Sequence, residues 1–357
     1  MNSQPRPADA LTDAIAALGH GVRCHWPFPG SPPLFVEPVA APLMRDRGAV
    51  IDWFRARTEA FDRIASEAGA YVLRGFPLRT AEDFSALTVH LPPMPLGYSG
   101  GATPRKAITG NVYEATQVPA MVQILLHQEM AYLHRYPAEL GFFCQVAPDS
   151  GGETIIGDMR RFQAGLPEPF LREIADKGVS YHRNFRASDV PHPCEAHPRI
   201  YHATLAQGFG TDDRAEVEAQ CRALGMTWRW LDDGSLSTRL DRPGFAVHRL
   251  TGRPVYFNHF LTQIMDLEWL GDTAGPYLDM YDRAGRPRPY HTTFGDGSEV
   301  TAQDYRRISA GLRAVTVGFP WQPGDVMILD NVHTAHGRNP YTGTRNVQVV
   351  MIDAPAG

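Results

Sequence analysis

The residues with the clearest chemical potential are His127 and Glu129, which flank Gln128 in the stretch from Ile124 to Tyr132. Aliphatic residues precede them and an aromatic residue follows, a pattern that favours a β-strand. Residues i and i+2 of a strand project from the same face, so the imidazole and the carboxylate are expected to point together. Such a pair can supply two ligands of a 2-His-1-carboxylate triad, which leaves coordination positions open on non-haem Fe(II).

The third ligand is expected from a histidine much later in the chain. Residues 321–338 contain a Pro-Gly turn, an apolar run and then a loop that carries His336. A His-x-Glu motif alone is common, and its alternative interpretation is a packed histidine beside a solvated acid. The combination with His336, followed by Arg345, is much more specific.

These motifs resemble the TauD/TfdA-type Fe(II)/2-oxoglutarate dioxygenases, and within them the SyrP-like branch, which shares His-x-Glu with clavaminate synthase. The resemblance covers roughly residues 70 to 352. It is carried by Thr103-Pro104-Arg105, Val112-Tyr113-Glu114, His127-Gln128-Glu129, Gly151-Gly152-Glu153-Thr154, Tyr256-Phe257-Asn258, Gly324-Asp325, Asn331, His336-Gly337-Arg338 and Arg345.

The resemblance implies a ligand set and a cofactor set. Fe(II) would be held by His127, Glu129 and His336, with 2-oxoglutarate and O2 as co-substrates. Thr154 and Arg345 match the family residues that bind the carboxylates of 2-oxoglutarate, and the planar guanidinium suits a bidentate carboxylate contact. The alternatives are a turn-capping hydroxyl for Thr154 and a surface salt bridge for Arg345.

The implied reaction releases succinate and CO2 and hydroxylates an sp3 carbon, with desaturation or epoxidation as alternative outcomes. Related halogenases carry a small residue at the position of Glu129, so halogenation is disfavoured. Taurine-type members carry a second arginine where this chain has Val349. The expected substrate is therefore an amino acid or an amino-acid-derived intermediate, free or bound to a carrier protein. Candidate substrate contacts are Arg105, Gln123, Tyr132 and Arg338.

Many short strands separated by turns must position these residues. Residues 71–76, 140–146, 179–185, 326–329 and 346–352 are expected as strands, and residues 50–68 and 211–224 as helices. The pattern predicts a mainly β fold with helical insertions (α+β). The resemblance implies a double-stranded β-helix core, which is a cupin-like jelly roll. Residues 1–357 are expected to form one domain, with an N-terminal extension at 1–45 and a lid or insertion at 186–225.

Two other motifs could suggest different functions. Gly97-Tyr98-Ser99-Gly100-Gly101 fits the nucleophile elbow of a serine hydrolase, but the prolines on both sides favour a loop. His192, Cys194 and His197 could be misread as a zinc site, although no fourth ligand is near in the sequence. A non-enzymatic cupin-like binding protein is the remaining alternative, and it would bind its ligand without forming succinate.

Composition and charge agree with an enzyme that acts on small molecules. A net charge of −5 lacks the basic excess of a nucleic-acid-binding protein. The N-terminus lacks a signal-peptide pattern and no long apolar run occurs, so a cytoplasmic protein without membrane insertion is expected. Cys24, Cys144, Cys194 and Cys221 are scattered, which predicts reduced thiols. A homo-oligomer is compatible with these properties.

Overall fold

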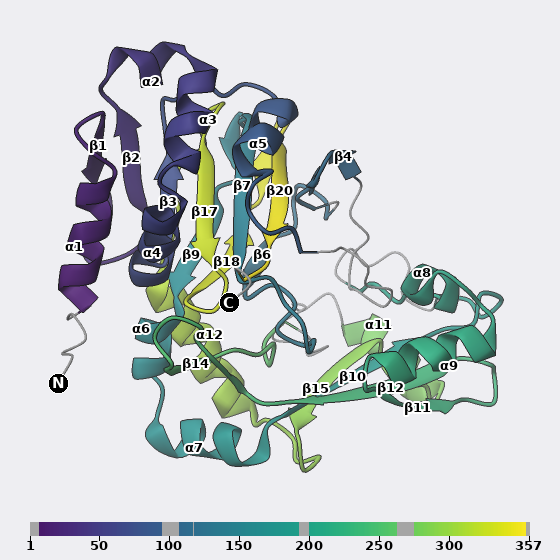
Figure 1. Cartoon of the computed structure of the whole chain (residues 1–357). Helices are drawn as coiled ribbons and strands as arrows, with labels where there is room; N and C mark the ends of the chain where they lie inside the picture. Colours follow the sequence, from purple (N-terminus) through teal and green to yellow (C-terminus); the bar gives the residue numbers. More distant parts are fainter. Residues whose placement is uncertain (1–6, 95–106, 117, 193–199, 263–274, 355–357) are drawn as a thin grey trace.

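Two β-sheets pack against each other in the core of the protein (Figure 1). The computed structural model describes residues 7–94, 107–116, 118–192, 200–262 and 275–354. The main sheet has eight strands in the order β1-β2-β3-β17-β7-β20-β5-β4, and the minor sheet has four in the order β16-β9-β18-β6. The main-sheet strands are β1 (Val22–His25), β2 (Leu34–Pro38), β3 (Ala70–Leu73), β17 (Val326–Asp330), β7 (Glu139–Val146), β20 (Asn346–Ile352), β5 (Val112–Glu114) and β4 (Ala107–Thr109). The minor-sheet strands are β16 (Thr316–Val317), β9 (Thr154–Asp158), β18 (Thr334–Arg338) and β6 (Ile124–His127).

The central strands of the main sheet are buried on both faces. Along β17, Met327 and Leu329 enter the core between the sheets, whereas Val326 and Ile328 enter a second core beneath the helices. Strands covered on both sides read as continuous apolar runs, which explains why they are recognisable in the sequence. The inner faces of the two sheets meet where Phe142 of β7 contacts His336 of β18, with ring centroids 5.3 Å apart.

N-terminal helices cover the outer face of the main sheet (Figure 1). Their apolar faces contribute Ala14, Val50, Phe61 and Phe84 to the second core. The helices are α1 (Pro7–Ala17), α2 (Ala41–Arg45), α3 (Arg47–Arg55), α4 (Thr58–Ala68) and α5 (Ala81–Thr88). The helix expected at 50–68 is therefore two helices. The expected extension at 1–45 joins the main sheet, because β2 pairs in parallel with β3.

A third sheet extends to one side of the two central sheets (Figure 1). Its strands are β11 (Thr227–Trp230), β12 (Leu236–Arg242), β10 (Val179–Phe185) and β15 (Tyr290–Phe294), paired in that order. The region expected as a lid lies beside it and contains α8 (Leu205–Phe209) and α9 (Arg214–Ala223). Asp213 caps α9 by accepting a hydrogen bond from the Glu216 N–H group.

Helix α12 (Ala302–Val315) packs against the minor sheet. Ile308 and Leu312 are buried apolar residues of α12, which packs near β9, where Gly157 faces Val315. The other elements are α6 (Met159–Ala164), α7 (Glu168–Lys177), α11 (Gly275–Arg283), β8 (Ser150–Gly151), β19 (Tyr341–Thr342), β13 (Phe245–Val247) and β14 (Pro254–Tyr256). The two facing sheets with helical additions confirm the predicted α+β class and jelly-roll core.

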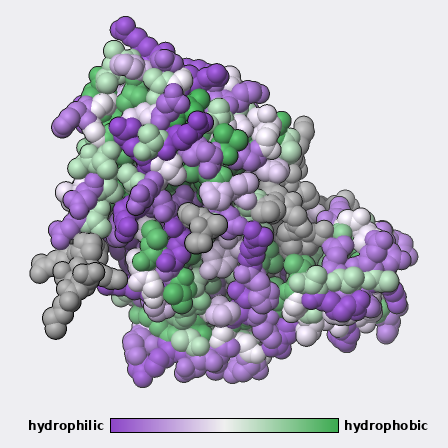
Figure 2. Space-filling model, viewed as in Figure 1, coloured by the Kyte–Doolittle hydropathy of each residue, from purple (hydrophilic) through white to green (hydrophobic). Residues whose placement is uncertain are grey.

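The exterior is mainly polar on the face shown in Figure 2, where apolar residues are scattered among hydrophilic ones. Among the described helices, none has both the length and the apolar character required to cross a bilayer.

Candidate metal and cosubstrate site

Two neighbouring strands of the minor sheet bring the candidate ligands together. His127 ends β6 and His336 lies on β18, and the antiparallel register places these two residues directly opposite each other. The strands approach closely beside this pair: a Cβ atom at Gly337 would lie 2.4 Å from the carbonyl oxygen of Ile124. Only glycine allows this backbone approach, so Gly337 is required by the geometry of the site.

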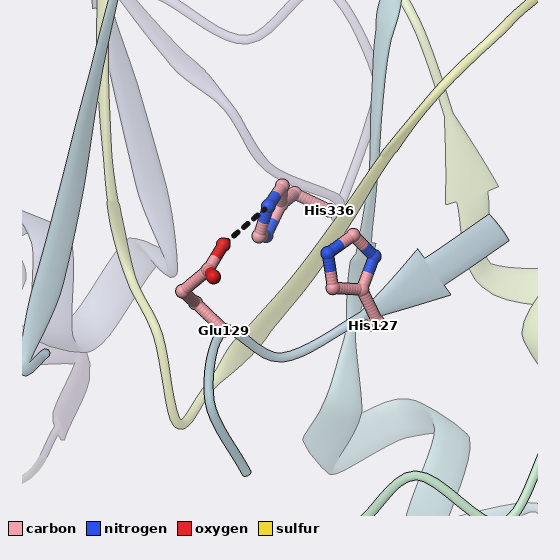
Figure 3. A group of neighbouring side chains, drawn as sticks. All are labelled: His127, Glu129 and His336. Carbon is pink, nitrogen blue, oxygen red and sulfur yellow. Dashed lines mark ion pairs between the residues drawn. The ribbon is translucent and has the colours of Figure 1, made fainter. Parts of the chain in front are cut away.

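His127, Glu129 and His336 converge on one point (Figure 3). One ligand atom from each lies within 4.8 Å of the other two, and His336 Nε2 is 3.7 Å from Glu129 Oε2. The two imidazole rings are 4.4 Å apart and inclined at 44°. His127 Nδ1 lies 2.8 Å from the carbonyl of Leu125, so this nitrogen carries the proton and Nε2 is left to coordinate a metal. This set of donors fits Fe(II) bound on one face.

The carboxylate reaches the site by a route that differs from the predicted one. The strand expected at 124–132 ends at His127, and Glu129 lies in the turn that follows. Strand alternation therefore does not bring Glu129 beside His127. The chain turns instead, and Met130 has a φ of 57° in the left-handed region. The prediction that the two side chains converge is correct, but its structural reason was wrong.

Thr154 and Arg345 form a second group of contacts. Arg345 donates from Nη2 to Thr154 Oγ1 at 3.3 Å and from Nε to the Gly152 carbonyl at 2.9 Å. Trp321 Nε1 also donates to Thr154 Oγ1, at 3.1 Å. In the cross-strand register Thr154 lies opposite Arg338, two pairs away from His336 opposite Ile156. Thr154 therefore shares the sheet face that carries His336.

The Arg345 side chain provides a partly buried positive charge. Burial, together with the nearby Arg338 guanidinium, lowers its pKa to about 10. Within the described ranges, no carboxylate forms an ion pair with Arg345. Removing a cation from water without an anionic partner is costly, so a carboxylate ligand would be favoured here. This environment fits one end of 2-oxoglutarate and argues against a surface salt bridge.

The predicted substrate contacts have different surroundings. Arg338 is buried and donates to the carbonyls of Val118, Pro119 and Val122 at 2.7–3.0 Å, so it holds the segment that leads into β6. Gln123 is exposed, with its amide 3.5 Å from Asn339 Oδ1. Tyr132 is buried, with its ring 5.3 Å from that of His259. Arg105 lies outside the described residues.

The alternative motifs can be placed only in part. Ser99, Cys194 and His197 lie outside the described residues. His192 is described, and its Nε2 atom accepts a hydrogen bond from the His202 N–H group at 3.2 Å.

Sequence reasoning missed several residues that support the site. Asn331 contacts both backbone polar groups of Glu129, His259 binds the Gln128 carbonyl, and Trp321 binds Thr154. One signal was available for Asn331: it is among the residues that carry the family resemblance, and it lies between a buried apolar run and His336. The role of His259 depends on a contact between distant segments and has no local signal.

Comparison with known proteins gives consistent matches over most of the chain. The family described as "Taurine catabolism dioxygenase TauD, TfdA family" matches residues 39–351. The dapdiamide synthesis protein DdaC of Enterobacter agglomerans is 32% identical over 293 residues, which are 82% of this chain and 84% of the relative. A clavaminate synthase-like protein of Arabidopsis thaliana is 30% identical over 331 residues, covering 90% and 92% of the two chains.

A solved structure shares the fold. The crystal structure of AAD-2 in complex with Mn(II) and N-oxalylglycine matches with a TM-score of 0.50 and 12% identity, covering 94% of this chain and 98% of that one. At this level of identity the likeness concerns the fold.

Proposed function

The chain belongs to the TauD/TfdA family of Fe(II)- and 2-oxoglutarate-dependent dioxygenases, and we propose that it hydroxylates an sp3 carbon of an amino acid or an amino-acid-derived intermediate. The observation that carries this proposal is the convergence of His127, Glu129 and His336 beside Arg345 and its hydrogen-bond partner, the buried Thr154. In this proposal the first three residues hold Fe(II). Residues 1–357 act as one domain, and residues 186–225 act as a lid.

Each residue of the proposed site has a distinct task. Iron held by His127, Glu129 and His336 would supply the chemistry that oxidises an unactivated carbon, with 2-oxoglutarate and O2 consumed and 2-oxoglutarate converted to succinate and CO2. Arg345 and the Thr154 hydroxyl, which are hydrogen-bonded to each other, would hold a carboxylate of 2-oxoglutarate. His127, held through Nδ1 by the Leu125 carbonyl, keeps its ring oriented before any metal binds.

The neighbourhood of Arg345 supports an amino-acid-like substrate over a sulfonate. Val349, at the position of the second arginine of taurine enzymes, is fully buried in the core between the sheets. No cation is therefore available from this position. The relative DdaC is named for dapdiamide synthesis, which supports a role in building a natural product.

In this proposal Gln123 and Tyr132 contribute substrate contacts, together with Arg105. A substrate role for Arg338 is not supported by its three bonds to backbone carbonyls.

A substrate screen tests this proposal. The enzyme with Fe(II), 2-oxoglutarate and O2 would be given free amino acids, small peptides and aminoacyl groups linked to a carrier protein. We expect one of these classes to stimulate succinate formation together with an oxygenated product. Mass spectrometry separates a gain of one oxygen from a loss of two hydrogens, which distinguishes hydroxylation from desaturation. Stimulation by taurine or an aryloxyacetate alone would contradict the proposed substrate class.

A further inference from the structure

Glu129 occupies a position that its own strand does not fix. β6 ends at His127, and the carboxylate-bearing residue lies in the turn beyond it. The next residue, Met130, is the one non-glycine residue of the described ranges with a positive φ, at 57°. A left-handed conformation is unfavourable for such a residue and persists only where surrounding contacts over-determine it. The contacts that hold this turn therefore also hold a candidate metal ligand.

Asn331 supplies these contacts from a segment distant in the sequence. Its Oδ1 atom accepts a hydrogen bond from the Glu129 N–H group at 2.7 Å, and its Nδ2 group donates to the Glu129 carbonyl at 3.0 Å. The same Nδ2 group donates to the Pro137 carbonyl at 2.9 Å. The Asn331 side chain is fully buried. The Asn331 amide therefore forms hydrogen bonds with both backbone polar groups of Glu129 and links them to Pro137.

The residue before Glu129 is fixed independently. The Gln128 carbonyl accepts a hydrogen bond from His259 Nε2 at 2.6 Å, and the Gln128 side chain donates to the carbonyls of Tyr256 and Val332. The Val332 carbonyl belongs to the same loop as Asn331. The backbone at 128 and 129 is thus attached to this loop by two separate side chains.

The loop that carries Asn331 is itself held in place. The Asp330 carboxylate accepts hydrogen bonds from the N–H groups of Val332 and His333 at 2.9 and 2.8 Å, and lies 2.8 Å from His248 Nε2. The Asn331 N–H group donates to the Ala138 carbonyl at 2.9 Å. The turn that positions the Asn331 amide next to Glu129 is therefore buried and held by several hydrogen bonds.

We propose that Asn331 is a positioning residue that sets the Glu129 carboxylate for metal binding, and that the Asp330–His248 pair supports it. This inference rests on the proposed metal centre. Only an amide offers both the acceptor and the donors that the two backbone groups of Glu129 require. Alanine would remove all three hydrogen bonds. Aspartate would keep the volume and one acceptor while losing both Nδ2 bonds.

The inference can be tested with Co(II) as a spectroscopic probe of the metal-free protein. Asn331→Ala and Asn331→Asp should raise the Kd for Co(II) about 10- to 100-fold, as is typical when a residue behind a metal ligand is lost. Their visible Co(II) spectra should also differ from that of the wild type, because the carboxylate is no longer held. The isosteric aspartate variant keeps the test usable if the alanine variant does not fold.

Asn184→Ala provides a matched control. Asn184 is also buried and donates from Nδ2 to a backbone carbonyl, that of Arg288, but it lies on β10. Its loss should leave the Kd and the Co(II) spectrum unchanged. Wild-type affinity and spectrum in both Asn331 variants would overturn the inference, as would an equal loss of affinity in Asn184→Ala. Absence of Co(II) binding by the wild type would instead overturn the proposed metal centre, and the inference with it.

Discussion

Two clusters in this protein each contain two histidines and one acidic residue, and they differ in what they can bind. His127, Glu129 and His336 form one cluster, and His248, Asp330 and His333 form the other. In each, two imidazoles and one carboxylate bring ligand atoms within 4.8 Å of one another. Residue composition and distance alone therefore do not identify a metal site. The orientation of the rings and the use of the carboxylate oxygens distinguish the two.

In the second cluster these groups are used by the protein itself. The His248 and His333 rings stack with centroids 3.7 Å apart and planes inclined by only 18°. Nitrogen lone pairs lie in the plane of their ring, so those of two stacked, nearly parallel rings lie in separate planes and do not converge on one ion. The Asp330 carboxylate already accepts hydrogen bonds from two backbone N–H groups, and it pairs with His248. This cluster is a hydrogen-bonded support in the protein interior.

The first cluster is arranged differently. Its two rings are inclined at 44°. The Glu129 side chain is 13% exposed and lies at the edge of the core. His336 shares a sheet face with Thr154, and Thr154 accepts a hydrogen bond from Arg345. These contacts connect the first cluster to the partly buried charge of Arg345. The difference shows that a metal site needs lone pairs that converge on one point.

The largest expected effect is the loss of iron when a histidine of the first cluster is removed. Removal of a histidine from the second cluster should leave the iron bound. His336→Ala should lose essentially all iron and turnover, because two protein ligands on an open site hold Fe(II) poorly. His333→Ala removes a histidine from the adjacent loop and should keep iron while unfolding more easily. Metal content by mass spectrometry after anaerobic loading, with circular dichroism to confirm folding, checks both variants. Full iron occupancy in His336→Ala would refute the ligand assignment.

The second-largest expected effect concerns Arg345, whose partly buried charge lies beside the first cluster. Arg345→Ala should raise the apparent KM for 2-oxoglutarate by the loss of a charge-assisted pair, about 2–4 kcal/mol or on the order of 30- to 1000-fold. Steady-state kinetics at varied 2-oxoglutarate would measure it. Arg249→Ala serves as a control, because Arg249 is also partly buried but pairs with Asp62 and Glu139. An unchanged KM in Arg345→Ala would remove this residue from the cosubstrate site.

The smallest effect is a pH dependence from the second cluster. Burial lowers the pKa of His333 to about 4, so the folded protein holds it neutral while the unfolded chain protonates it below about pH 6.5. The unfolded state then binds more protons, and the free energy of unfolding should fall by up to about 3 kcal/mol as the pH drops from 6.5 to 4. Urea unfolding of the metal-free protein should show this slope, and His333→Phe should show a weaker one. Equal slopes would mean that other groups cause the dependence.

The sequence predicted the fold where burial leaves a strong local pattern. The apolar runs of β7, β17 and β20 are covered on both faces, and the predicted strands at 179–185 and 346–352 agree with the structure. The α12 helix was missed, although its buried apolar residues, Ile308 and Leu312, are four residues apart and lie on one helix face. The division of residues 50–68 into two helices was also missed. The order of strands in each sheet depends on distant pairings and has no local signal.

The candidate site was predictable in its ligands but not in its support. His127, Glu129 and His336 follow from residue types and from the resemblance to a family. The placement of Glu129 beyond the end of β6, held by Asn331, depends on contacts between segments far apart in the chain. The sequence likewise gave no reason to separate His333 from His336 beyond that resemblance. It also favoured a substrate contact for Arg338, whose donors are directed to three backbone carbonyls.

An anaerobic titration with Fe(II) in the presence of saturating 2-oxoglutarate tests the central claim most directly. Chelation of the iron by 2-oxoglutarate should produce a weak visible charge-transfer band that reaches its end point at one equivalent of Fe(II) per chain. The band should be absent from His127→Ala and present in His333→Phe. No band in the wild type, an end point at two equivalents, or a band that persists in His127→Ala would contradict the assignment of the metal to the first cluster.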